Sequence, residues 1–121
     1  ERARFWRKRL GGGLRQVGIL AAAGLYALRH NIERLAEDHE NARKIASILA
    51  DAGLDVFMAA RPTNMVYFRA KDVPSADGIL EFCRRERVVF NKSAPDTFRL
   101  DVSAEAALEA ASIIARAARS A

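Results

Sequence analysis

The segment from Val17 to Leu28 constrains the fold most, because it holds twelve consecutive residues without a charge. Its sequence, VGILAAAGLYAL, is apolar on every side of a helix, so most of its surface must be covered by other protein. A membrane span would need about 20 such residues, and Arg29 and His30 follow where a signal peptide would be cleaved. The segment is therefore predicted to be a packed helix.

Three helices are predicted in the first half of the chain. A basic helix over residues 1–10 ends at the glycine run 11–13, since consecutive glycines disfavour helix and permit positive φ. The apolar helix then covers about residues 14–30. Asn31 is a typical N-cap for a third helix, and Gly53 is a typical C′ residue at its end.

The rest of the chain changes to the two-residue period of strands, interrupted by helices. The predicted order is strand 55–59, a turn at 61–64, strand 65–70, helix 75–87, strands 88–91 and 97–102, and a last helix that Ser103 caps, with Ala106 at N3. In a chain of 121 residues, this indicates one core and an α/β (α+β) fold. N-terminal helices precede a ββαββα unit, a small antiparallel sheet covered by helices on one face.

The sequence RKRLGGGLRQ, at residues 7–16, is the first candidate site. A glycine-rich turn before a helix offers unpaired backbone N–H groups, and the helix dipole adds positive character there. Lys8 and Arg15 add full charges, and residues 1–16 carry six basic side chains against Glu1. The pattern is typical of a phosphate or carboxylate site. The alternative is a flexible joint with solvated basic residues, and spacing alone does not decide between them.

Arg99 is the second candidate, because its predicted strand alternates strictly. Phe98, Leu100 and Val102 share the face that is expected to meet the helices, which leaves Arg99 on the opposite face. A guanidinium fixed on a strand can bind a carboxylate through two parallel hydrogen bonds. The alternative is an ordinary exposed strand arginine, which is the more frequent case.

The other reactive side chains indicate little chemistry. His39 lies on the inward stripe of the third helix, and His30 lies in a last helical turn, where a cation suits the dipole. Cys83 is the single cysteine, which excludes an internal disulfide, fits a reducing compartment and reads as a buried small hydrophobe. The histidines and this cysteine lack metal-ligand spacing.

Several motifs resemble the C-terminal half of the L-threonine aldolases. The most specific is GGG-x-RQ-x-GILAAAG at residues 11–24, and the similarity spans nearly the whole sequence. Further matching runs are Trp6-Arg7-Lys8, Tyr26-Ala27-Leu28, Glu37-Asp38-His39, Asn41-Ala42, Thr63-Asn64-Met65, Arg99-Leu100 and Asp101-Val102-Ser103. The chain is therefore expected to be the C-terminal part of such an enzyme.

The resemblance implies a fold-type-I enzyme that binds pyridoxal 5′-phosphate and assembles as a homotetramer, a dimer of dimers. Such enzymes cleave β-hydroxy-α-amino acids, typically L-threonine and L-allo-threonine, to glycine and an aldehyde, with the cofactor ring as electron sink. It also implies that residues 1–30 are connecting helices from a large upstream cofactor-binding domain and that residues 31–121 form the C-terminal small domain. A cytoplasmic location without nucleic-acid or membrane partners is expected.

The resemblance also implies roles for three basic residues. Arg99 matches the arginine that holds the substrate α-carboxylate. Lys8 and Arg15 match residues that approach the active site, with Arg15 directed at the cofactor phosphate. The lysine that binds the cofactor and the active-site histidines lie upstream in this family, so the family's lysine is none of Lys8, Lys44, Lys71 and Lys92.

One departure from the family pattern follows Arg99. Family members usually have about four more residues before the Asp-Val-Ser run, and a change of this length keeps the strand alternation in phase. Here Arg99-Leu100-Asp101 runs straight through. The two interpretations are a genuine shortening, which would weaken the role of Arg99, and a stretch missing from the sequence, and we favour the second.

Two rival functions remain open. A non-enzymatic domain could use the basic segment for nucleic acid, with salt-dependent affinity. Another fold-type-I enzyme, an aminotransferase or a β-eliminating lyase, would share the cofactor but release different products. The chain alone is expected to have no aldolase activity.

Overall fold

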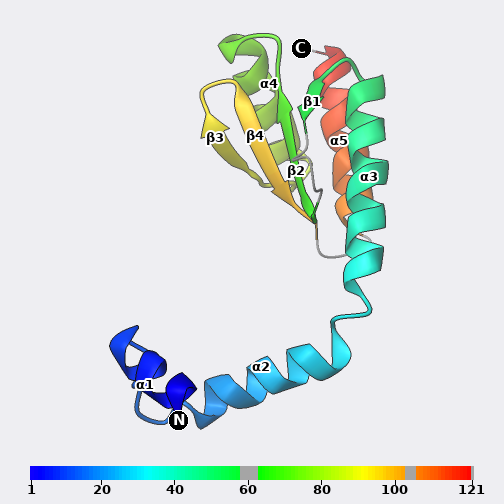
Figure 1. Ribbon diagram of the computed structural model, residues 1–121. Helices are drawn as coiled ribbons and strands as arrows, with labels where there is room; N and C mark the ends of the chain where they lie inside the picture. The colour runs from blue at the N-terminus through cyan, green and yellow to red at the C-terminus, as the bar shows by residue number, and fades with distance from the viewer. Residues whose placement is uncertain (58–62, 103–105, 121) are drawn as a thin grey trace. The chain divides into compact units, whose positions relative to one another are not determined.

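The computed structural model describes residues 1–57, 63–102 and 106–120, in two units, Glu1–Arg34 and Leu35–Ala121. The first unit consists of helices α1 (Arg2–Arg9) and α2 (Gly18–His30) (Figure 1). The second contains the sheet and the other helices. Each unit is described by itself.

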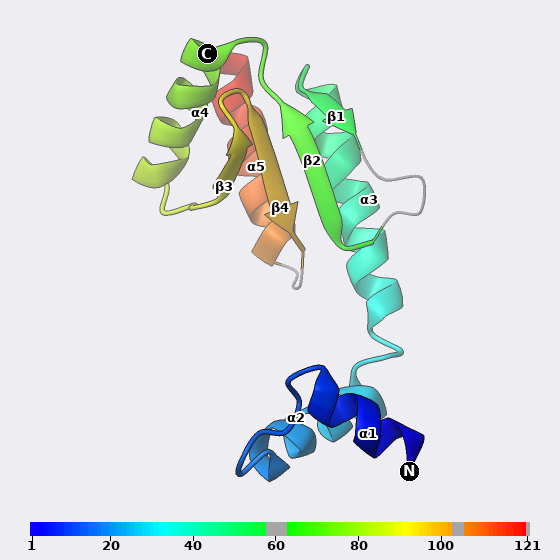
Figure 2. The same ribbon diagram turned by 60° about the vertical axis from the view of Figure 1, so that its left-hand side comes forward.

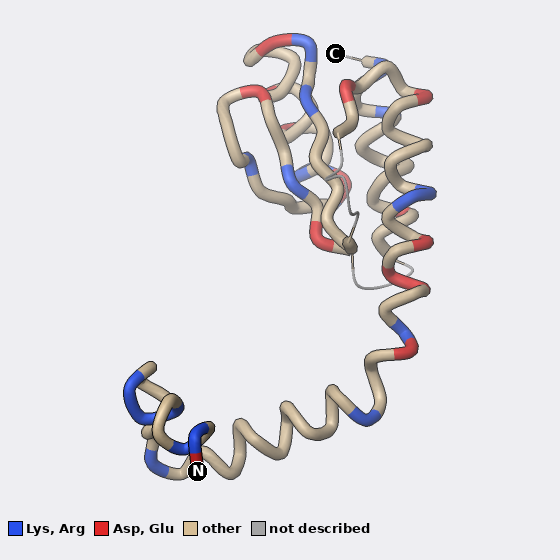
Figure 3. Tube along the Cα trace, in the orientation of Figure 1, with Lys and Arg blue, Asp and Glu red and all other residues tan. Residues whose placement is uncertain are grey.

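Helix α2 carries the apolar segment and leaves it uncovered within its own unit. The tube in Figure 3 is blue along much of α1, where basic residues dominate, and tan along most of α2. No residue of α1 or α2 is buried. The large side chains that α2 exposes are Ile19, Leu20, Leu25, Tyr26 and Leu28. Covering these side chains requires protein surface beyond this unit.

Asn31 ends α2, so the prediction that it caps the third helix was wrong. Its backbone N–H donates to the Ala27 carbonyl at 2.9 Å, which continues the hydrogen-bond ladder of α2. A turn follows, and helix α3 begins at Leu35 and runs to Asp51. The start of α2 also differs from the prediction, because Gln16 adopts a φ of 53° that interrupts helix just before it.

The second unit contains a four-stranded antiparallel sheet with the order β1-β2-β4-β3. Its elements are β1 (Asp55–Phe57), β2 (Met65–Arg69), α4 (Val73–Arg85), β3 (Asn91–Ala94), β4 (Thr97–Asp101) and α5 (Ala106–Ser120). Helices α3, α4 and α5 lie on one face of the sheet (Figures 1 and 2). The predicted small antiparallel sheet with helices on one face is confirmed.

The core lies between the sheet and these helices. Phe68 of β2 and Phe98 of β4 are paired in register, fully buried and stacked with ring centroids 4.9 Å apart. The Phe90 ring meets Phe98 edge-on at 5.2 Å. Buried Val102 and exposed Arg99 confirm the predicted alternation along this part of the chain.

Helix α4 begins and ends two residues before its predicted bounds of 75 and 87. It begins early because Asp72 is its N-cap and accepts a hydrogen bond from the Ser75 N–H at 2.8 Å. It ends early because Arg87 adopts a φ of 62° and Val88 N–H donates back to the Cys83 carbonyl at 2.8 Å. Arg87 thus takes the left-handed conformation at the helix end that glycine usually adopts.

Strand β3 lies at Asn91–Ala94 rather than at the predicted 88–91. The apolar run Val88–Phe90 connects α4 to the strand outside the ladder, and Phe90 turns its ring into the core. Strand β4 pairs residue by residue with β2 from Thr97 to Asp101. The ladder runs without interruption from Arg99 to Asp101, and a stretch missing from the sequence after Arg99 stays a prediction.

Three earlier expectations lie outside the described residues. They concern the second half of the strand predicted at 55–59, part of the turn at 61–64, and the Ser103 cap of the last helix. From Ala106 onward α5 is helical, with Ala111, Ile114 and Ala115 among its buried residues.

Candidate functional site

Arg99 lies on a central strand, on the face of the sheet that the helices leave open. In the register, Tyr67 of β2 is opposite Arg99 on one side and Asn91 of β3 is opposite it on the other. Phe57 of β1 is opposite Tyr67 in turn, and the two rings stack with centroids 5.8 Å apart. These cross-strand neighbours therefore place the Arg99 cation beside two aromatic side chains on the sheet.

The guanidinium of Arg99 has an acidic partner on its own strand. Its Nη2 donates to Oδ2 of Asp101 at 3.0 Å, and the two side chains are 43% and 48% exposed. The hydrogen bond and the charge of Asp101, followed by the neighbouring Tyr67, raise the pKa of Arg99. Arg99 is therefore a permanent cation that water and a ligand can both reach.

A pocket of about 260 Å³ lies at the edge of β4 beside this ion pair. It forms where β3 pairs only with residues Thr97–Arg99, so that the last two residues of β4 lack a partner on that side. Its lining comprises Ile45, Val88, Val89, Phe90, Asn91, Arg99, Leu100, Asp101, Val102, Ala107 and Ala110. The volume lies below the roughly 300–1,000 Å³ of pockets for drug-sized ligands, and most of the lining is apolar.

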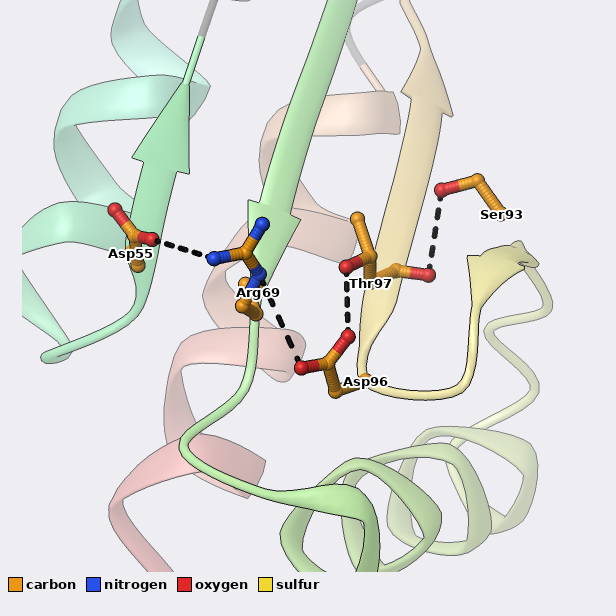
Figure 4. A network of polar contacts seen from close by, with 5 residues as sticks. All are labelled: Asp55, Arg69, Ser93, Asp96 and Thr97. Carbon is orange, nitrogen blue, oxygen red and sulfur yellow. Dashed lines mark hydrogen bonds and ion pairs between the residues drawn. The ribbon is translucent and has the colours of Figure 1, made fainter.

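A second arginine on the open face, Arg69, is held by two carboxylates (Figure 4). Its Nη1 lies 3.7 Å from Asp55 and its Nε lies 3.9 Å from Asp96. Asp96 also accepts a hydrogen bond from the Thr97 hydroxyl at 2.8 Å, so the buried Thr97 side chain has a polar partner. Arg69 therefore has two carboxylates at longer range, whereas Arg99 has one hydrogen-bonded carboxylate.

The glycine turn after α1 is a Schellman motif, which corrects the view that its N–H groups are all unpaired. Gly12 N–H donates to the Arg7 carbonyl at 2.7 Å, and Gly11 N–H donates to the Lys8 carbonyl at 3.3 Å. Gly11 has a φ of 81°, the left-handed conformation that this motif requires. These two N–H groups therefore complete the end of α1 and are not available to an anion.

The charges of the same segment remain suited to an anion. Lys8 lies in the last turn of α1 and Arg15 lies three residues before α2, and both side chains are exposed. Val17 precedes α2 without a side-chain cap, so the first turn of the helix keeps its positive character. This arrangement suits an anion bound by Arg15 and by the start of α2 rather than by the N–H groups of Gly11 and Gly12.

The sulfhydryl and the imidazoles do not form a reactive cluster. Cys83 is buried, and desolvation, with a smaller contribution from Glu86, raises the pKa of its thiol to about 11. His39 is half-buried on α3 and His30 is exposed at the end of α2. In residues 1–57, 63–102 and 106–120 no group of His, Cys, Asp and Glu could hold a metal ion.

The candidate residues are divided between the two units. Lys8 and Arg15 belong to the unit Glu1–Arg34, and Arg99 belongs to the unit Leu35–Ala121. Sequence reasoning missed Asp101 as the partner of Arg99, although a spacing of two residues in one strand could have indicated it. It also missed Tyr67, whose place opposite Arg99 only the register reveals.

Among the described helices, none is long and apolar enough to cross a membrane.

Comparison with known proteins gives consistent matches. Residues 1–71 match a family described as beta-eliminating lyase. The low specificity L-threonine aldolase of Escherichia coli strain K12 is 44% identical over 113 residues, which is 92% of this chain and 33% of that protein. Low-specificity L-threonine aldolase 1 of Arabidopsis thaliana is 44% identical over 73 residues, 60% of this chain and 20% of that protein. The chain thus spans a third or less of the length of these relatives.

Proposed function

Because the chain belongs to the beta-eliminating lyase family, we propose that it is the C-terminal part of a pyridoxal-phosphate-dependent L-threonine aldolase. The proposed reaction cleaves a β-hydroxy-α-amino acid, such as L-threonine or L-allo-threonine, to glycine and an aldehyde. The observation that carries the proposal is 44% identity to an aldolase across 92% of the chain, which includes the strand that holds Arg99.

Two parts of the chain receive different roles in this proposal. Residues 1–30 are connecting helices from a large upstream domain of fold type I, and residues 31–121 are the C-terminal small domain. The uncovered apolar surface of α2 supports the first role, because such a helix is stable only when other protein covers it. The separate buried core of the sheet and its helices supports the second.

Arg99 is proposed to bind the α-carboxylate of the substrate. Its exposed guanidinium keeps donors beyond the one that Asp101 uses, so it can still form two parallel hydrogen bonds with a carboxylate. The strand beneath it is anchored by Phe98 in the core, which fixes the position of the cation. Binding at this point would orient the amino acid for reaction at its other end.

The donor set around Arg15 fits the phosphate of the cofactor. Residues 2–17 contain six basic side chains and no acidic one, and α2 begins without a side-chain cap. We propose that Arg15 binds this phosphate and that Lys8 approaches the substrate. When bound, pyridoxal phosphate would supply an electron sink for cleavage of the Cα–Cβ bond. The lysine that holds it is proposed to lie upstream of this chain.

Assembly and location follow from the same proposal. We propose a homotetramer of paired dimers, in which the exposed apolar side chains of α1 and α2 are covered by the upstream domain or by another subunit. A cytoplasmic location fits the single buried cysteine, which needs no oxidising compartment.

The test is carried out on the full-length protein. Purified protein should show visible absorbance from lysine-bound cofactor that borohydride removes, and incubation with L-threonine should release glycine and acetaldehyde in equal amounts. Release of ammonia and a keto acid would instead indicate a β-eliminating lyase, the activity after which the matched family is described. A colourless protein that bound DNA through residues 2–9 would refute both.

A further inference from the structure

Asp101 faces the same side of β4 as Arg99 and forms an ion pair with it. Both side chains are close to half exposed, so the pair lies at the surface of the open sheet face and beside the pocket at the β4 edge. A carboxylate that reaches Arg99 must therefore approach a carboxylate that is already present.

We propose that the carboxylate of Asp101 repels incoming carboxylates at Arg99 and thereby weakens their binding at this site. The inference rests on the proposed function only in naming an amino acid as the ligand. It assigns to Asp101 a role in setting substrate affinity.

The geometry allows a ligand carboxylate to bind Arg99 while Asp101 stays in place. The contact joins one nitrogen of Arg99, Nη2, to one oxygen of Asp101 at 3.0 Å, whereas a guanidinium has five N–H donors. A ligand carboxylate can therefore use the remaining donors while the ion pair persists. Two anions then face one cation.

The surrounding charges do not compensate for the second anion. Among the described residues of the open face, the other arginine is Arg69, and Asp55 and Asp96 already hold it. Lys92 of the neighbouring strand pairs with Asp77 of α4 at 2.6 Å, on the helix-covered side. The neighbours of Arg99 across the strands are Tyr67 and Asn91, which carry no positive charge.

The expected size of the effect follows from the exposure of the pair. Two unit charges about 4 Å apart in water repel by an amount equal to roughly fivefold in affinity. Salt weakens the interaction at longer separations, since the screening length is about 8 Å at physiological ionic strength. Removal of the Asp101 charge should therefore strengthen carboxylate binding by about threefold to fivefold.

The first experiment measures threonine cleavage by the full-length protein with Asp101→Asn and Asp101→Glu. Asparagine keeps the shape and a hydrogen-bond acceptor but removes the charge, so KM should fall by about threefold to fivefold while kcat changes less than about twofold. Glutamate restores the charge and should return KM to near the wild-type value. An unchanged or raised KM in Asp101→Asn would overturn the proposal.

The second experiment reads Arg99 directly and does not need turnover. Phenylglyoxal modifies accessible arginines, and peptide mass spectrometry gives the rate at Arg99 in full-length protein with increasing acetate, with chloride keeping the ionic strength constant. The acetate concentration that halves this rate should be about threefold lower in Asp101→Asn than in wild type. Arg43, which pairs with Glu40 at 2.7 Å and is similarly exposed, is the internal control and should not respond to the substitution.

The two experiments separate this inference from the proposed function. If wild-type protein does not cleave threonine, the aldolase proposal fails and the acetate measurement alone decides the role of Asp101. If wild-type protein is an aldolase but acetate protects Arg99 equally in both proteins, the role of Asp101 is refuted and the aldolase proposal stands.

Discussion

Replacement of Phe98 by alanine should strongly destabilise the sheet unit. The side chain is 0% exposed, and it packs against the rings of Phe68 and Phe90 at 4.9 and 5.2 Å. A buried Phe→Ala change removes apolar contact and leaves a cavity, which lowers the free energy of unfolding by about 3–5 kcal/mol. Phe98→Leu keeps part of the bulk but loses two ring pairs of roughly 0.5–1.5 kcal/mol each, so a smaller loss is expected.

Urea unfolding of the 121-residue chain, followed by far-ultraviolet circular dichroism, measures these losses. All the buried hydrophobic residues described lie between Ala42 and Ala117, so the cooperative transition reports on the sheet unit. Val89→Ala is the control, because Val89 is 82% exposed and its loss should change the free energy by less than about 0.5 kcal/mol. A Phe98→Ala loss as small as that of the control would refute the description of the core.

Other expected outcomes test the site and the helix ends. In the full-length protein, Arg99→Lys should raise the KM for threonine about tenfold or more, because an ammonium cannot form two parallel hydrogen bonds, and unchanged kinetics would remove Arg99 from the substrate site. Gly11→Ala should cost roughly 1–2 kcal/mol at its φ of 81° and speed amide exchange at the end of α1, while Gly13→Ala should have little effect. Asp72→Ala should lower the Tm of the chain. Because the Ser75 N–H lowers the pKa of Asp72, this difference is expected above the ordinary aspartate pKa and should vanish as the pH falls through the lowered value.

The helix ends show why a sequence reveals some boundaries and hides others. Gly53 was predicted as the C′ residue of α3, and its φ of 86° confirms this. Arg87 takes the same conformation at the end of α4 without any glycine signal, so the predicted end was too late. Asparagine is found at both ends of helices. Asn31 lies at the end of α2 because its N–H donates to the Ala27 carbonyl, a bond that the sequence pattern does not reveal.

The face on which Arg99 lies was predictable from the alternation of apolar residues along its strand. Its neighbour on the next strand and the hydrogen-bond partners of the glycine turn were not predictable. Burial of one sheet face requires apolar side chains at every second position of β4, which placed Arg99 on the other face. The neighbour Tyr67 comes from another strand, and no local pattern specifies which residue lies opposite. The glycines at 11–13 resembled an anion-binding turn because the same residues also suit a helix end, which takes up the N–H groups of Gly11 and Gly12.

The outer strand β3 also limits how copies of this chain can associate. It is four residues long, carries a register shift between Lys92 and Ala94, and joins β4 through a short turn. A short, irregular edge with a lysine is a poor template for a strand from another molecule, so a continuous intermolecular sheet is disfavoured along this side. Association of copies along the β3 edge is therefore not expected to seed fibrils.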